Sequence, residues 1–336
     1  MIHPSTFTMK THLRFPRHIL LAFAFFSTLS VLQLTCSLAF SNPAFAEKFS
    51  LTGKPAPTYP DIKYGPHERN VLDLWIAKSV KPTPLVVFIH GGGFISGDKR
   101  GINEGFLNDC LAAGVSVMSI NYRYHGSATL PEILRDCARA IQFVRYHAKD
   151  YNIDPVRVAS FGGSAGAGTS LWLAFHPDLV DPANPDPVLR QSSRLVAAGA
   201  MNPQASYKIS EWRSFLGPFE FTGARAAEYE MFSQEPTDPK ELAEANDLSM
   251  LQLASKDDPP VFLYNNRPDF PSEVRGDYVH HPGHVRALKK RCDEVGIPVT
   301  IMFTQAEPVT EGDVFVALRD FFFAQFKNTS SKNSER

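Results

Sequence analysis

Short, continuous apolar runs alternate along the chain with longer segments in which apolar residues recur every three to four positions. The runs have the length of strands and lack exposed alternate positions, so they predict strands buried on both faces. They comprise residues 85–89, 115–120, 156–161, 195–200, 261–264 and 299–303. The periodic segments predict helices over residues 132–147, 284–295 and 313–326. This alternation predicts an α/β fold, in which a mainly parallel sheet is flanked by helices.

Three segments depart from the alternation. Residues 70–75 alternate polar and apolar positions, which predicts an antiparallel edge strand. Residues 203–258 are rich in aromatic and charged side chains, and they form either a small cap inserted over the strand ends or an ordinary pair of surface helices. The polar residues 328–336 predict a disordered tail. The main domain is therefore expected to span residues 47–327.

The first 46 residues resemble an export signal. Lys10, Arg14 and Arg17 come without any acidic residue, and the apolar stretch 19–40 is followed by the small-residue site 44–46. We therefore expect residues 1–46 to be a cleaved signal peptide and the mature protein to be secreted or periplasmic. The alternative is an uncleaved N-terminal membrane anchor, because the stretch is long enough to cross a bilayer core of about 30 Å.

Composition and charge narrow the possible partners. With 43% hydrophobic and 12% aromatic residues, a chain of 336 residues can bury one large core. The net charge of -1, or -4 after the predicted cleavage (31 basic against 35 acidic residues), gives no reason to expect nucleic acid or an anionic membrane as a partner. Cleavage would leave Cys110, Cys137 and Cys292, which allow at most one internal disulfide and do not resemble a metal site, so no metal is predicted. Cys137 falls on an apolar helical stripe, where a buried free thiol is expected.

A nucleophile motif follows the third buried strand. Residues 162–166 read Gly-Gly-Ser-Ala-Gly, a G-x-S-x-G sequence between an apolar strand and a helix of small residues. The glycines allow a tight strand-to-helix turn that presents the Ser164 hydroxyl at a helix N-terminus, where negative charge is stabilised. This context predicts that Ser164 is a catalytic nucleophile.

A glycine-rich loop follows the first buried strand, with the sequence His90-Gly91-Gly92-Gly93-Phe94. Acyl transfer needs backbone N–H donors aimed at a tetrahedral oxyanion, and glycines let the backbone approach it closely. The expected donors are Gly92, Gly93 and Ala165. A phosphate-binding loop is the rival interpretation, but its Gly-Lys-Ser/Thr ending is missing.

With the segments 121–123 and 152–158 and with Asp136, these motifs resemble the α/β-hydrolase carboxylesterases of the hormone-sensitive-lipase-like and bacterial feruloyl-esterase-like groups. The resemblance extends over residues 71–326. It implies an α/β-hydrolase fold, serine attack on an ester, hydrolysis of an acyl-enzyme by water, and no cofactor. It also implies that His90 positions the glycine loop and that Asp136 and Asp154 are structural.

The resemblance places the triad acid after the strand 261–264, where Asp269 has the expected spacing and Asp277 is the second candidate. The base should follow the strand 299–303, but that loop reads Thr-Gln-Ala-Glu-Pro-Val-Thr, and no histidine occurs after His284. His280, His281 and His284 lie close to Asp269 in sequence. We expect His281 or His284 to reach Ser164, unless these histidines only form a polar loop and a helix start.

Glu307 is a further substitute for the base, although a carboxylate is weakly basic unless burial raises its pKa.

The leading hypothesis is a serine carboxylic-ester hydrolase acting on small-molecule or polysaccharide-linked esters, with no nucleic-acid partner and no membrane contact after signal cleavage. The alternative is a catalytically impaired hydrolase fold that serves as a binding or scaffold protein, because the expected histidine is missing. A peptidase on the same fold is a third possibility, but the large extra domain common in peptidases is missing.

Overall fold

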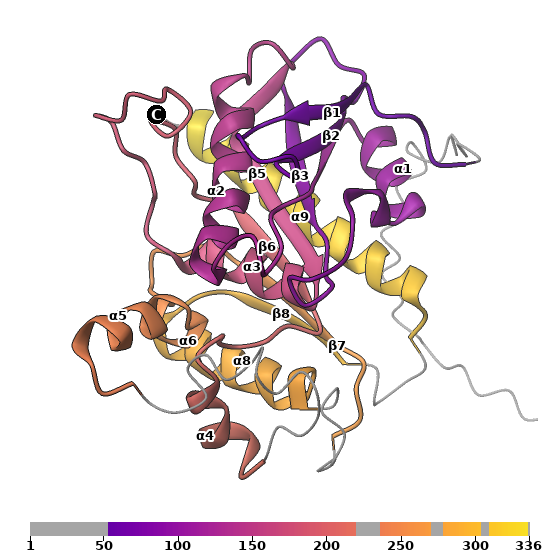
Figure 1. Ribbon diagram of the computed structural model, residues 1–336. Helices are drawn as coiled ribbons and strands as arrows, with labels where there is room; N and C mark the ends of the chain where they lie inside the picture. Colours follow the sequence, from indigo (N-terminus) through magenta and orange to yellow (C-terminus); the bar gives the residue numbers. More distant parts are fainter. Residues whose placement is uncertain (1–52, 220–235, 270–277, 304–308, 335–336) are drawn as a thin grey trace, which may run out of the picture. The chain divides into compact units, whose positions relative to one another are not determined.

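The computed structural model describes residues 53–219, 236–269, 278–303 and 309–334. In this part of the chain, eight strands form one sheet with the order β1-β2-β4-β3-β5-β6-β7-β8 (Figure 1). The strands are β1 Tyr59–Lys63, β2 Val71–Trp75, β3 Thr83–Ile89, β4 Ser116–Ile120, β5 Ile153–Gly163, β6 Ala197–Met201, β7 Val261–Asn265 and β8 Val299–Phe303. The pairs β1–β2 and β2–β4 are antiparallel and all others are parallel. The predicted α/β fold is confirmed.

Helices cover both faces of the sheet because alternate strand residues point to opposite sides. In β3, Leu85 and Val87 belong to the core beneath α2, α3 and α8, whereas Val86 and Phe88 belong to the core beneath α1 and α9. The longer helices are α1 Glu104–Ala112, α2 Leu130–Tyr146, α3 Ala165–Phe175, α5 Pro239–Asp247, α8 Gly283–Val295 and α9 Glu311–Ser334. The three predicted helices correspond to α2, α8 and α9.

Two expectations about the ends of the fold are wrong. Residues 71–75 do pair antiparallel, but β1 lies outside them and forms the sheet edge. β1 was not predicted because it contains Pro60 and exposed charged residues, although proline is tolerated in an edge strand. The polar residues 328–334 continue α9 instead of forming a disordered tail, since they contain no glycine or proline that would end a helix.

The connection from β6 to β7 contains short helices where the cap or surface helices were expected. They are η3 Ile209–Trp212, α4 Arg213–Leu216, α5 and α6 Met250–Leu253, and residues 220–235 lie outside the described part. Ile209, Trp212 and Phe219 form a small apolar cluster with Tyr278 and Val279. The connection therefore packs against the segment that leads into α8 (Figure 1).

Three cysteines within the described residues, Cys110, Cys137 and Cys292, are buried free thiols. The predicted signal peptide lies outside these residues. None of the described helices is both long and apolar enough to cross a membrane.

Candidate active site

Ser164 occupies a strained turn between β5 and α3. Its backbone has φ 53° and ψ -118°, a conformation that non-glycine residues rarely adopt. A Cβ atom at Gly162 would lie 2.3 Å from the Ile89 carbonyl oxygen, and one at Gly166 would lie 2.0 Å from it. Only glycine fits at these two positions. The Ser164 N–H donates to the Met201 carbonyl at 2.9 Å, which ties the turn to the end of β6.

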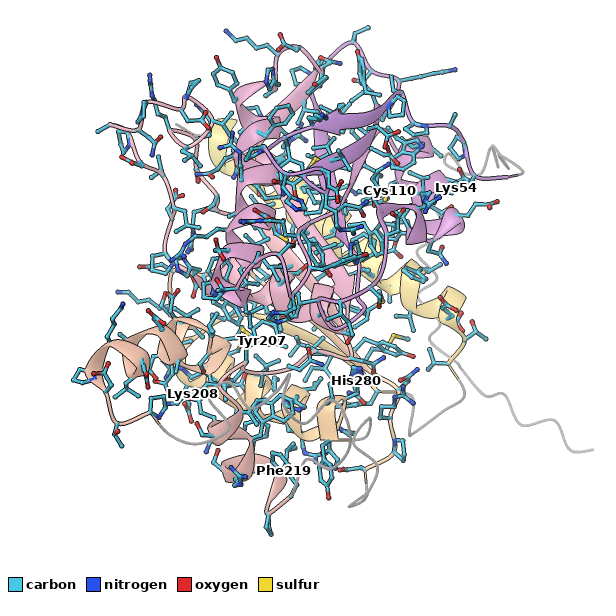
Figure 2. The ribbon with its side chains drawn as sticks, viewed as in Figure 1. Lys54, Cys110, Tyr207, Lys208, Phe219 and His280 are labelled. Atoms are coloured by element: carbon cyan, nitrogen blue, oxygen red, sulfur yellow. The ribbon has the colours of Figure 1, made fainter. Side chains whose placement is uncertain are left out.

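His280 is the histidine that reaches Ser164. Its Nε2 lies 3.2 Å from the Ser164 Oγ, within hydrogen-bond distance. His280 belongs to the segment directly before α8, near the end of β7 (Figure 2). The expectation that His281 or His284 would contact the serine is therefore corrected.

His284 has a structural environment instead. Its side chain is fully buried against Trp212 and Phe215, and burial lowers its pKa to about 3. Its Nδ1 accepts from the Ala205 N–H at 3.2 Å, so its Nε2 carries the proton and donates to the Tyr278 carbonyl at 2.9 Å. Both ring nitrogens are thus engaged by backbone groups.

His281 and Asp269 come together beside α8. The Asp269 Oδ1 lies 3.8 Å from the His281 Nε2, and both carboxylate oxygens accept from Arg286, at 2.6 and 2.8 Å. The Arg286 guanidinium lowers the pKa of Asp269. The structure thus joins the predicted acid to one predicted base, but the histidine beside Ser164 is a different one.

Three buried side chains hold the backbone around His280, and we call them the carbonyl clamp (Gln204, Asn265 and His284). The carbonyl of Tyr278 accepts from His284, that of Val279 from Gln204 at 2.9 Å, and that of His280 from Asn265 at 2.9 Å. All three clamp side chains are less than 5% exposed. Because three consecutive carbonyls are fixed, the imidazole of His280 is presented from a rigid turn.

The far nitrogen of the His280 ring faces an amide. The Gln204 Nε2 lies 3.5 Å from the His280 Nδ1, at the outer limit of a hydrogen bond. The candidates Asp277 and Glu307 lie outside the described residues. Sequence reasoning missed both Gln204 and Asn265. Asn265 could have been noticed, because it is a buried polar residue at the end of an otherwise apolar strand.

The glycine loop lies against the serine turn. A Cβ on Gly91 would be 2.6 Å from the Gly163 carbonyl oxygen and 3.5 Å from the Ser164 Cβ. Gly92 and Gly93 have positive φ values of 112° and 60°. The Gly92 carbonyl accepts from the N–H groups of Ile95 and Ser96, which turns the loop back on itself. Glycine is therefore required both for the close approach and for the turn.

His90 supports this loop from behind. Its ring is 3% exposed and stacks on Tyr122 at a centroid distance of 4.2 Å. Its Nδ1 lies 2.7 Å from the Gly91 carbonyl oxygen, and burial lowers its pKa to about 4. A neutral, fully engaged histidine suits positioning better than proton transfer.

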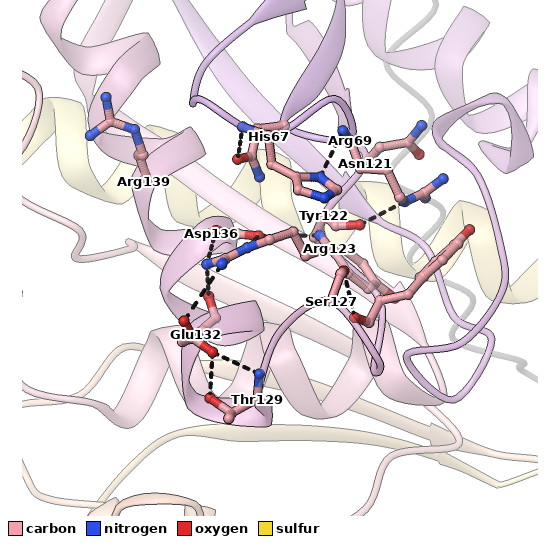
Figure 3. Close-up of polar contacts among 12 residues, drawn as sticks. His67, Arg69, Asn121, Tyr122, Arg123, Ser127, Thr129, Glu132, Asp136 and Arg139 are labelled. Carbon is pink, nitrogen blue, oxygen red and sulfur yellow. Dashed lines mark hydrogen bonds and ion pairs between the residues drawn. The ribbon is translucent and has the colours of Figure 1, made fainter.

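The two aspartates expected to be structural form ion pairs. Asp136 pairs with Arg123 (Figure 3), and Asp154 caps a turn and pairs with Arg157, as expected of structural residues.

A cavity of about 650 Å³ opens beside Ser164 and His280. Polar side chains in its wall are those of Asn103, Asn202, Asn266, Arg267 and Glu311. The apolar part of the wall is formed by Phe88, Met201, Tyr264, Val309, Val314 and Phe315. The cavity thus offers apolar side chains together with polar and charged groups next to a nucleophile, and a small molecule could use both.

The chain matches the BD-FAE family model over residues 72–270, more than half of its length. It is 30% identical over 220 residues to the Mycobacterium tuberculosis protein named "Probable carboxylic ester hydrolase LipM". This match covers 62% of this chain and 47% of that protein. It is 28% identical over 245 residues to the mouse bile salt-activated lipase, in a match that covers 62% of this chain and 40% of the lipase. The chain thus spans less than half of the length of these relatives.

Solved structures share the fold. A truncated carbohydrate esterase from gut microbiota superposes with a TM-score of 0.64 at 20% identity, over 81% of this chain and 100% of the other. Esterase B from Lactobacillus rhamnosis superposes with a TM-score of 0.60 at 16% identity, over 84% of this chain and 91% of the other. These similarities establish an α/β-hydrolase fold.

Proposed function

Because the chain belongs to the BD-FAE family of α/β-hydrolases, we propose that it is a serine carboxylic-ester hydrolase. The observation that carries the proposal is the 3.2 Å contact between the Ser164 Oγ and the His280 Nε2. It supplies the strained serine with an imidazole base, the component that was missing from the expected loop. The relatives that are named as esterases and lipases support the same reaction. The impaired-scaffold alternative finds no support in these comparisons.

The proposed mechanism uses groups that already lie around the serine. In the tautomer with its proton on Nδ1, His280 takes the Ser164 proton on Nε2 while the Oγ attacks the ester carbonyl carbon. The N–H groups of Gly92, Gly93 and Ala165 stabilise the oxyanion, and the positive end of α3 adds to this effect. His280 then protonates the leaving alcohol. A water molecule, deprotonated by His280, hydrolyses the acyl-enzyme and releases the acid.

The cavity is compatible with two classes of proposed substrate, small-molecule esters and acyl groups attached to polysaccharides. Its volume of about 650 Å³ fits a small acyl or alcohol group, and its wall offers such a group both apolar side chains and polar groups. One protein of the same fold is described as a carbohydrate esterase, in agreement with the polysaccharide option. The mechanism requires no cofactor.

The first test compares initial rates of short-chain aryl ester hydrolysis by residues 47–336 and by the same protein with Ser164→Ala. We expect the wild-type rate to disappear with the serine, and a fluorophosphonate to label only the wild type. Equal background rates in both proteins, with no labelling of Ser164, would contradict the proposal.

We further propose that the protein is exported, with residues 1–46 removed. The basic start and the small-residue site at 44–46 support this proposal. N-terminal sequencing of the mature protein after expression of the full chain in a bacterial host tests it. A mature chain that begins at Glu47 is expected, and an intact N-terminus in the membrane fraction would support the anchor.

A further inference from the structure

Arg69 lies behind the glycine loop, just before β2. Its Nη2 is 3.4 Å from the His90 Nε2 and 3.4 Å from the Gly97 carbonyl oxygen. Its Nε donates to the Tyr122 carbonyl at 2.8 Å (Figure 3), and its guanidinium lies 3.7 Å from the centre of the Tyr124 ring. Four contacts therefore fix the guanidinium against the Nε2 edge of the His90 ring.

Two neighbours of His90, Arg69 and Gly91, determine which ring nitrogen carries the His90 proton. A guanidinium N–H can only donate, so the Nε2 facing Arg69 has to accept. A carbonyl oxygen can only accept, so the Nδ1 facing Gly91 has to donate. Both contacts require the neutral tautomer with its proton on Nδ1. Protonation of Nε2 would place an N–H against the positive guanidinium.

The His90 proton in turn orients one peptide group. In a trans peptide the C=O of Gly91 and the N–H of Gly92 point in opposite directions. With the Gly91 oxygen held by His90, the Gly92 N–H is directed away from the imidazole. Gly97 packs directly against the hydrogen bond between His90 and Gly91, because a Cβ there would lie 2.4 Å from the His90 Nδ1 and 2.3 Å from the Gly91 oxygen.

We propose that Arg69 is a positioning residue of the oxyanion loop. It holds His90 as the Nδ1–H tautomer, and His90 holds the Gly91–Gly92 peptide so that the Gly92 N–H is offered to the substrate oxyanion. The effect on catalysis rests on the esterase function proposed above, whereas the effect of Arg69 on the His90 tautomer is independent of that function.

The groups around His90 come from every segment packed against it. They are Arg69 before β2, Tyr122 and Tyr124 after β4, and Asp98 at the start of η2 Lys99–Gly101. The His90 pKa is lowered to about 4, with burial as the largest cause and the charge of Arg69 acting in the same direction. The hydrogen bond to the Gly91 carbonyl and the charge of Asp98 oppose this shift. The Tyr122 pKa is raised well above its ordinary value, so this ring stays neutral. His90 is therefore neutral at neutral pH.

The direct test is ¹⁵N NMR of the imidazole nitrogens in the full chain labelled at histidine, with the His90 signals identified by their loss in His90→Asn. The wild type is expected to show a protonated Nδ1 and an unprotonated Nε2. In Arg69→Met a population protonated at Nε2 should appear, and Arg69→Lys should restore the wild-type pattern. Arg139→Met is the matched control, since Arg139 also donates to a backbone carbonyl, that of Tyr64, at a distance from His90. An unchanged His90 spectrum in Arg69→Met overturns the proposal.

The kinetic test uses the pH dependence of the wild-type to Arg69→Met ratio of kcat. Loss of one oxyanion donor costs about 10²–10³ in kcat, so a partial loss should lower kcat by about 10-fold at pH 8 with little change in KM. The ratio should shrink at acidic pH, because protonated His90 regains its Nδ1–H. A ratio that stays constant with pH overturns the catalytic part of the proposal. If the wild type hydrolyses no ester, the proposed function fails, while the NMR result still decides the role of Arg69.

Discussion

The imidazole of His280 lies 3.2 Å from the Ser164 hydroxyl although 116 positions separate the two residues along the chain. The resemblance to carboxylesterases places the base in the loop after β8, whereas this histidine enters from the segment before α8. That segment follows β7, the neighbour of β6, whose last carbonyl holds the Ser164 N–H. A histidine at this place can therefore approach the serine from an adjacent strand end.

His280→Ala should reduce kcat for aryl acetate hydrolysis by about 10³-fold or more, because the serine loses its proton acceptor. His281→Ala is the matched control and should change kcat only a few-fold, since the His281 ring faces Asp269 and the Gly283 N–H. The opposite result, with His281 essential and His280 dispensable, would show that the arrangement around Ser164 is different in the working enzyme.

Asn265→Leu tests the carbonyl clamp. The change keeps the branched shape and the number of heavy atoms of the side chain but removes the donor to the His280 carbonyl. The imidazole should then be held less firmly, and kcat should fall about 10-fold or more at an unchanged KM. Gln142→Leu is the control, because the buried Gln142 amide also donates to backbone carbonyls but lies on α2. If both variants lose stability and neither loses kcat, the clamp only stabilises the fold.

Asp269→Asn should leave kcat within a few-fold of the wild type. The Asp269 carboxylate is neutralised by Arg286, which lowers its pKa, and its side chain is 41% exposed. The same measurement on Asp277→Asn tests the second candidate for the acid. A loss of about 10²-fold or more in Asp269→Asn alone would restore Asp269 as the triad acid.

The parts of the site that could be predicted from sequence are those in which local backbone geometry dictates the residue type. Gly162 and Gly166 surround Ser164 because any Cβ would collide with the backbone of β3, and this requirement appears as a contiguous motif. Gly91 and Gly92 are required for the same kind of reason, because an added Cβ would meet the backbone of Gly163 or of Ser96. The strands were recognisable for a similar reason, since burial on both faces demands unbroken apolar runs.

The base and its supports could not be predicted because they depend on contacts between distant segments. Nothing near His280 distinguishes it from His281 and His284, and only packing decides which ring faces the serine. Gln204 and Asn265 are neutral amides without a motif, and each acts through a single backbone carbonyl. Their roles become visible only when the ends of β6 and β7 are placed beside the segment before α8.

Gly97→Ala should nearly abolish activity while the protein stays folded. Gly97 has a φ of 102°, and an added Cβ would lie 2.4 Å from the His90 Nδ1, so the loop has to move away from the imidazole. Ester hydrolysis and far-UV circular dichroism should be measured together. Gly114→Ala is the control, because Gly114 also has a positive φ of 76° but has open space around it. Equal activity in the two variants would contradict the requirement for this contact.

The buried His284 should make the protein less stable in acid. Its pKa is about 3 in the folded state against 6.5 for an exposed histidine, so the unfolded chain binds one more proton between these values. Stability therefore falls as the pH drops from about 6.5 towards 3, by about 1.4 kcal/mol per pH unit for this group. In urea titrations at pH 7.5, 6.0 and 4.5, His284→Gln should be less stable at neutral pH, because an apolar site loses a fitted ring, yet should lose less stability on acidification. Parallel pH dependences in the two proteins would mean that His284 titrates normally and is not held neutral by burial.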